Sequence, residues 1–310
     1  MSALHEQIAA ELARPVDPAV RTFAEKLAGE AKRAPLGILF YGSALRSGDL
    51  TGVLDFYVIL ERLEDWPRSL AARSANRLLP PNVEHHEMMV EGGCVRAKVA
   101  ILSLSQFTRL TRGDSLDSSV WARFAQPVAL VFTLDEASTQ RIIGAVGAAV
   151  ATAAAWAARL GLPEAQPLAF WRELFARTYA SELRVEKMGH ATSIVDAAPD
   201  RFAAILAPAL QAAGIETEQR PDGSMRPLVS ATERRAAVRA WRRQRLLAKP
   251  LNMARLAKAA FTFKGGADYI VWKIARHSGV EIRLSPWQRR HPILASGTVL
   301  WRLWRHGVLR

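Results

Sequence analysis

Cysteine is almost absent: the 310 residues include one, Cys94. A single thiol excludes an internal disulfide and a cysteine-based zinc cluster, and it is typical of a reducing compartment. Long apolar runs are also lacking. The most apolar stretch, residues 142–158, is rich in alanine and shorter than the roughly 20 strongly apolar residues that a membrane span needs. We therefore expect a buried or amphipathic helix there and no spanning segment.

The N-terminus lacks the apolar core of a signal peptide, so we expect no targeting segment. Half of the residues are hydrophobic and 23% are charged, which is the composition of a folded protein rather than a disordered one. A chain of this length is expected to form about two domains.

Acidic residues are scarce in the last quarter of the chain. Residues 231–310 have 18 lysines and arginines against three acidic residues, whereas residues 1–230 have 24 basic and 26 acidic residues. The net charge of +13 therefore belongs to the C-terminal part. A basic block of this kind binds polyanions, which are nucleic acids or anionic membranes.

Short apolar runs and longer helical patterns together predict an α+β fold with a mixed sheet. Strands are expected at residues 36–41, 53–60, 82–90, 95–102 and 128–132. Helices are expected within residues 3–33 and at residues 67–79, 136–160, 170–187, 201–213 and 232–263. Residues 219–227 have the composition of a loop and are the expected hinge.

The segment YGSALRSGDLTGVLDFYVIL, residues 41–60, has the pattern that carries chemistry. One strand runs into Gly42 and Ser43, and the next strand holds Asp55. Glycine lets a backbone approach a triphosphate, and the serine hydroxyl and nearby N–H groups can bind phosphate oxygens. A strand carboxylate can hold Mg²⁺ against the phosphates. This layout resembles the nucleotidyltransferase fold, although a turn glycine and a capping aspartate would produce the same short pattern.

Tyr57 occupies the position at which most nucleotidyltransferases have a second carboxylate. Alternate residues of a strand share a face, so Tyr57 and Asp55 should point the same way. Tyrosine cannot replace a metal-binding carboxylate. Either the chain is catalytically inactive, or it belongs to a branch that uses one carboxylate in this strand.

Such a branch exists, and several segments resemble it in the same order. The chain is similar to the mitochondrial translocator assembly and maintenance proteins, which are peripheral CDP-diacylglycerol synthases with a YGSG start and a single strand aspartate. The similarity covers roughly residues 36–275. The further matching segments are KVAILS at 98–103, WARFAQPV at 121–128, LFARTYASELRVEKMGHATSIVD at 174–196, PDRFAAILAPAL at 199–210 and FTFKGGADYIVWK at 261–273.

The resemblance implies that the chain transfers CMP from CTP to phosphatidic acid with Mg²⁺, giving CDP-diacylglycerol and pyrophosphate. Asp55 would hold the metal and, with Lys98, carry the chemistry. Glu91 is the expected second metal ligand, and Arg184 the expected contact with the lipid phosphate. The implied nucleotide-binding residues are Tyr41, Gly42, Ser43, Lys98 and Arg123. On sequence alone, Lys98 would equally be a solvated strand lysine.

These assignments divide the chain into three parts: a nucleotidyltransferase domain at 1–135, a helical or winged-helix-like domain at 136–230, and a basic membrane-associating region at 231–310. Near the C-terminus, tryptophan alternates with arginine, a composition that suits lipid headgroups. The expected membrane contacts are Arg289, Arg290, Trp301, Arg302, Trp304 and Arg305. We expect a bacterial cytoplasmic protein attached to the inner membrane, with an anionic membrane surface as its partner and no nucleic acid.

Two other functions stay open. The basic C-terminal part would also fit a nucleic-acid-directed nucleotidyltransferase, although the sequence has no aromatic RNA-binding motif. Tyr57 and the missing second aspartate would fit a catalytically inactive scaffold that binds a nucleotide.

Overall fold

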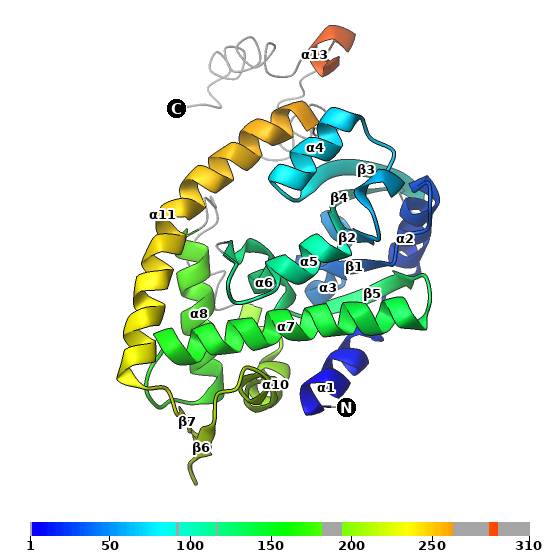
Figure 1. Ribbon diagram of the computed structural model, residues 1–310. Coiled ribbons are helices and arrows are strands. Elements are labelled where there is room, and N and C mark those ends of the chain that lie inside the picture. The colour runs from blue at the N-terminus through cyan, green and yellow to red at the C-terminus, as the bar shows by residue number, and fades with distance from the viewer. Residues whose placement is uncertain (1, 91–92, 116, 182–193, 263–284, 291–310) are drawn as a thin grey trace, which may run out of the picture.

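A five-stranded mixed sheet forms the centre of the computed structural model, which describes residues 2–90, 93–115, 117–181, 194–262 and 285–290 (Figure 1). The strand order is β3-β4-β2-β1-β5; β2 and β4 are parallel, and the other neighbours are antiparallel. The strands are β1 Gly37–Tyr41, β2 Val53–Leu60, β3 Asn82–Val90, β4 Gly93–Ser103 and β5 Val128–Thr133. The α+β fold and its mixed sheet are therefore as the sequence predicts.

Helices surround this sheet and continue beyond it. Their starts carry side-chain caps where the sequence offers them: Asp135 accepts from the Ser138 N–H at the start of α7, and Ser103 and Gln106 form a reciprocal capping box at α5. The helices are α1 Ala3–Leu12, α2 Pro18–Glu30, α3 Ser43–Ser47, η1 Leu63–Asp65, α4 Leu70–Leu78, α5 Leu104–Leu110, α6 Ser118–Phe124, α7 Glu136–Leu160, α8 Pro167–Ser181, α10 Pro199–Ala212, α11 Ala231–Thr262 and α13 Pro286–Arg290.

Alternation along β2 separates two apolar layers. Phe56 and Val58 belong to the layer that includes α2, whereas Tyr57 and Ile59 belong to the layer built around α7. Because side chains alternate along a strand, Asp55 shares the α7 side with Tyr57. Tyr41, which lies directly opposite Asp55 in the β1–β2 register, packs against this same layer, so the expectation that Asp55 and Tyr57 point the same way is confirmed.

Helix α7 is the core of the second layer. It is rich in alanine, and small side chains let α6, α8 and α10 pack closely against it. Among the described residues, α7 is the helix whose length and composition would also suit a membrane crossing, and 67% of that apolar window is buried inside the fold. The buried helix expected over residues 142–158 is therefore present.

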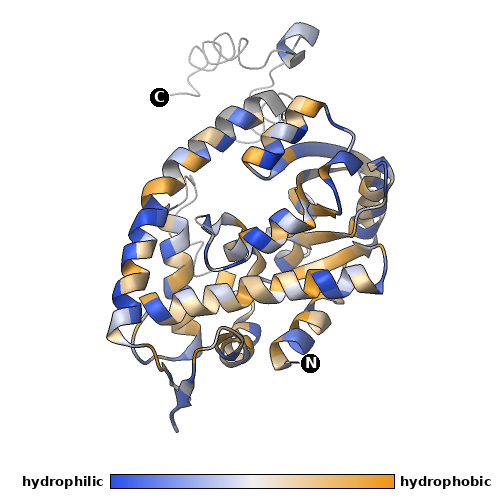
Figure 2. Ribbon diagram, in the orientation of Figure 1, coloured by the Kyte–Doolittle hydropathy of each residue, from blue (hydrophilic) through white to orange (hydrophobic). Residues whose placement is uncertain are grey.

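Helix α11 begins beside α7 and α8 and runs along one side of the molecule to β3 (Figure 1). Trp241 is buried and meets Trp156 edge-on, with 5.4 Å between the ring centroids. Many of the remaining residues of α11 are hydrophilic, in contrast to the largely hydrophobic strands of the sheet (Figure 2). The first half of the basic region is thus part of the folded body.

Residues 219–227, which were expected to form a loop and a hinge, instead include most of a small hairpin. Strands β6 Thr217–Gln219 and β7 Met225–Pro227 pair antiparallel around a turn that contains Gly223 at φ +82°. Met225 is buried and its backbone pairs with Ala165. The strands are too short and polar to show alternation in the sequence. The winged-helix likeness and the three-part division remain predictions.

Candidate functional site

Gly42 and Asp55 meet where β1 ends and β2 begins. Tyr41, the last residue of β1, lies opposite Asp55 in the antiparallel register. Gly42 has a φ of +94° and a ψ of −162°, a conformation open almost only to glycine. A Cβ atom on Gly42 would lie 2.8 Å from Asp55 Oδ2. The Asp55 carboxylate therefore lies against bare backbone, in space that any other residue would fill.

This contact predicts an unusually costly glycine substitution. Gly42→Ala should lower the free energy of unfolding by about 3 kcal/mol, because it combines backbone strain with a clash. Gly48→Ala is the matched control: Gly48 also has a positive φ, +72°, but open space around it, so its cost should be about 1 kcal/mol. Urea unfolding of both variants checks the difference.

A double-mutant cycle isolates the contact from the backbone strain. In an Asp55→Ala background the carboxylate is gone, so Gly42→Ala should cost about 1 kcal/mol less than in the parent protein. An equal cost in both backgrounds would mean that the carboxylate does not lie against Gly42.

Basic side chains lie near Asp55 and near its strand neighbour Tyr57. Lys98 is its neighbour across the parallel β2–β4 pair. Arg46, on α3, is near enough to feel the charge of Asp55: burial lowers the pKa of Arg46, and Tyr179 and Asp55 oppose that shift. Arg123, on α6, donates to the backbone oxygen of Ser119 one turn earlier. Asp55 therefore lies in a positively charged environment that suits a bound anion.

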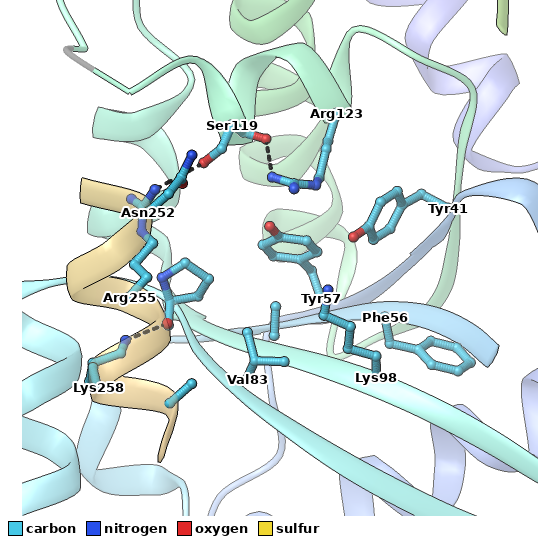
Figure 3. Close-up of a pocket in the computed structure, with 13 residues that line it drawn as sticks. Tyr41, Phe56, Tyr57, Val83, Lys98, Ser119, Arg123, Asn252, Arg255 and Lys258 are labelled. Atoms are coloured by element: carbon cyan, nitrogen blue, oxygen red, sulfur yellow. Dashed lines mark hydrogen bonds between the residues drawn. The ribbon is translucent and has the colours of Figure 1, made fainter. Parts of the chain in front are cut away.

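A cleft of about 130 Å³ opens between the sheet, α6 and the C-terminal half of α11 (Figure 3). Lys98 extends from the sheet toward Tyr57 and Arg123, while α11 supplies the opposite wall. Of the described residues that line the cleft, four are cationic and none is acidic. The four cations are Lys98, Arg123, Arg255 and Lys258.

The α11 side of the cleft, here called the α11 wall, consists of Asn252, Arg255, Lys258 and Ala259. Hydrogen bonds hold this wall in place. Arg255 donates to Asp117 Oδ2 at 2.5 Å and to the Pro80 carbonyl at 3.1 Å. Burial tends to raise the pKa of Asp117, but the Arg255 charge and the hydrogen bonds from Arg255 and Ser119 together outweigh it, and the pKa is lowered. Lys258 donates to the Leu79 and Pro81 carbonyls at 2.5 and 2.6 Å. Burial, aided by the Arg255 charge, lowers the pKa of Lys258 to about 8.

Tyr57 lies under the cleft as part of an aromatic cluster. Its ring meets Phe124 edge-on at 4.9 Å and lies 5.5 Å from the ring of Tyr41. Burial raises the pKa of the Tyr57 hydroxyl, so the side chain is a neutral phenol at pH 7. Tyr57 therefore fills the core where a second metal-binding carboxylate would otherwise stand.

The donor atoms near Asp55 suit a metal ion that takes few protein ligands. Across the described part of the chain, no three side chains of His, Cys, Asp or Glu come together as a metal cluster. Glu87 accepts from Arg96 at 3.0 Å, and His86 turns to the other side of the sheet and contacts Glu84. Mg²⁺ commonly takes one or two carboxylates and fills its shell with phosphate and water oxygens. Asp55 fits that pattern as a single carboxylate.

Several residues singled out in the sequence lie outside what the structure describes. Arg289 and Arg290 belong to α13, but their side chains are not described. Their proposed roles stay predictions. The predicted site residues outside the described ranges are Glu91, Arg184, Trp301, Arg302, Trp304 and Arg305.

The α11 wall is the part of the site that the sequence did not single out. Asn252, Arg255 and Lys258 all line the cleft. They are spaced by three residues, which places them on one face of a helix. This spacing is the signal that could have found them, but the many other basic residues of α11 conceal it.

Comparison with known proteins adds little. No protein-family model matches the chain, and no curated protein matches it. Among solved structures, a nucleotidyltransferase-like protein from Exiguobacterium sibiricum 255-15 is similar over 94% of this chain and 92% of that one, at 13% identity and a TM-score of 0.27. Likeness at this level carries no conclusion about function, so any assignment depends on this chain's own residues.

Proposed function

We propose that the chain is a nucleotidyltransferase that transfers CMP from CTP to phosphatidic acid, giving CDP-diacylglycerol and pyrophosphate. The observation that carries the proposal is the Asp55 carboxylate lying against the bare backbone of Gly42, beside a cleft lined by cations. The choice of CTP and of a lipid phosphate comes from the sequence resemblance.

Each residue of the site would have a distinct role in the transfer reaction. An oxygen of the acceptor phosphate attacks the α-phosphorus of CTP, and the bond from that phosphorus to pyrophosphate breaks. The acceptor is already an anion, so the chain needs no strong base and has only to position the reactants and neutralise charge. Gly42 and Ser43 would hold the triphosphate, and Lys98 and Arg123 would balance the charge that develops on pyrophosphate.

A magnesium ion would be held by Asp55. When bound, it would supply positive charge to the triphosphate. Since Tyr57 is neutral and packed among aromatic rings, we propose that the protein contributes one carboxylate from β2 and leaves the other positions to phosphate and water oxygens. The lipid acceptor would reach the cleft from an anionic membrane, toward which exposed Trp287 and the basic C-terminal residues would be directed.

The proposal is tested by offering α-labelled CTP and Mg²⁺ to the full chain with several acceptors. Vesicles containing phosphatidic acid should yield labelled lipid, whereas vesicles of phosphatidylcholine should yield none. Label transferred to an RNA oligonucleotide instead would favour a nucleic-acid-directed enzyme. Binding of CTP without transfer to any acceptor would favour the inactive scaffold, the alternative that Tyr57 specifically supports.

A further inference from the structure

The function proposed above assigns no role to the individual residues of the α11 wall. We propose that Arg255 and Lys258, with Asn252, form a separate subsite that binds the phosphate monoester of the acceptor. The nucleotide would then lie along Gly42, Ser43 and Asp55. This inference rests on the proposed function, since it assigns the two substrates to different parts of one site.

The two sets of residues occupy different positions. Arg255 and Lys258 line the cleft from α11, whereas Gly42, Ser43 and Asp55 do not line it. Lys98 lines the cleft and also neighbours Asp55 across the β2–β4 pair. Lys98 therefore links the α11 wall to Asp55, and a group bound at that wall would lie next to a nucleotide held along Gly42, Ser43 and Asp55.

The size of the cleft supports this division. Its volume of about 130 Å³ is well below the roughly 300–1,000 Å³ of pockets that enclose a drug-sized ligand. A phosphate group fits inside it. The cleft thus has room for the phosphate of a headgroup.

Charge selects an anion for that space. Lys258 donates to the backbone carbonyls of Leu79 and Pro81, which fix the position of its ammonium group at the cleft. Arg255 is paired with Asp117 behind the cleft and is fixed by Pro80 and Ser119. Both cations are held by backbone and side-chain partners before any ligand arrives, so little reorganisation is needed on binding. A phosphate monoester supplies the charged oxygens that such donors bind most strongly.

Binding measurements on the full chain test the assignment. The probes are dihexanoyl phosphatidic acid, sn-glycerol 3-phosphate and CTP with Mg²⁺, each titrated calorimetrically. Lys258→Gln should weaken both phosphate monoesters by roughly tenfold, the loss of one charge-assisted contact. Lys258→Arg should retain their affinity within threefold, and CTP binding should change less than twofold in either variant.

Arg243→Gln is the matched control, because it removes the same charge from an exposed position 15 residues earlier on α11, roughly 22 Å away along the helix. It should leave all three affinities unchanged. Tighter binding of the lipid than of glycerol phosphate would identify acyl contacts, and equal binding would identify the phosphate alone; both support the subsite. Failure of the parent protein to bind either monoester, or loss of CTP rather than monoester binding in Lys258→Gln, would overturn it.

The pH profile gives a second readout. Lys258 loses its proton above about pH 8, and loss of its charge should cost roughly tenfold, so monoester affinity should fall about threefold between pH 8 and pH 9. Among the described residues, the other charged or titratable groups at this cleft are Arg255, Lys98, Arg123, Tyr41, Tyr57 and Asp117. Lys258→Arg should abolish this fall in affinity, because arginine stays charged. If the affinity still falls in Lys258→Arg, another group is titrating, and that result would count against Lys258. If CTP turnover fails while these binding results hold, the proposed function falls and the anion subsite stands.

Discussion

Replacing Asp55 by asparagine should reduce CMP transfer roughly a hundredfold or more, the size of effect seen when a group that balances developing charge is removed. Asparagine has nearly the same shape, so it should still fit against Gly42, where Asp55 Oδ2 lies 2.8 Å from the position of a Cβ. What the variant lacks is the negative charge that would hold Mg²⁺ against the triphosphate. The measurement is the initial rate of labelled lipid formation at saturating CTP and phosphatidic acid.

Asp200→Asn is the control for this loss. Asp200 is exposed in the first turn of α10, on an element that does not line the cleft, and the substitution makes the same change of charge. Its rate should equal that of the parent protein, and both variants should unfold at nearly the same temperature. Activity of Asp55→Asn within fivefold of the parent protein, with the fold intact, would remove Asp55 from the mechanism.

The half of the site that contains Asp55 could be predicted because its signals are local. An apolar run, a glycine and a second apolar run lie within residues 36–60, and this pattern specifies two paired strands with a bend between them. Alternation along β2 then fixes the side on which Asp55 and Tyr57 lie. The strands expected at residues 53–60 and 82–90 have the same bounds in the structure.

The other half depends on contacts between distant parts of the chain. Arg255 reaches Asp117, 138 residues earlier, and Lys258 reaches the carbonyl of Leu79, 179 residues earlier. No local pattern marks such a partner, and the surrounding excess of arginine suggests a solvated or membrane-bound helix. The basic character of α11 was therefore visible in the sequence, whereas its position against the cleft was not.

The role of Tyr57 also depends on a contact with a distant part of the chain, which no local sequence pattern reveals. The sequence reveals that a carboxylate is missing from this position, but the reason lies in packing. Phe124, which meets the Tyr57 ring, is on α6 and comes 67 positions later in the chain. The aromatic cluster that occupies the position exists only once β2 and α6 are assembled.

Glu84 should be among the most costly residues to change in the sheet. Its side chain is 1% exposed and accepts hydrogen bonds from Arg68, Trp66 and His86 on the side of the sheet away from the cleft. Glu84→Gln removes the negative charge that pairs with Arg68. The nearly buried Arg68 guanidinium is then left without that opposite charge. We expect the free energy of unfolding to fall by about 3 kcal/mol, the lower end for breaking a buried pair.

Glu87→Gln is the matched control on the same strand. Glu87 also pairs with an arginine, Arg96, but its side chain is 49% exposed, so its loss should cost less than about 1 kcal/mol. Urea unfolding at pH 7 checks both values. Equal costs for the two variants would mean that the Glu84 network adds nothing beyond a surface ion pair.

The pH dependence of the same pair follows from the sign of the pKa shift. Burial tends to raise the pKa of Glu84, but hydrogen bonds from His86 and Arg68 outweigh it, so the pKa is lowered from its model-peptide value of 4.5. A carboxyl with a lowered folded-state pKa stabilises the protein above its unfolded pKa, and that stability is lost as the pH falls through the folded value. The difference in free energy of unfolding between the parent protein and Glu84→Gln should therefore be largest at neutral pH and should become smaller below pH 4.5. A gap that stays constant from pH 7 to pH 3 would show that the carboxylate charge is not what stabilises this side of the sheet.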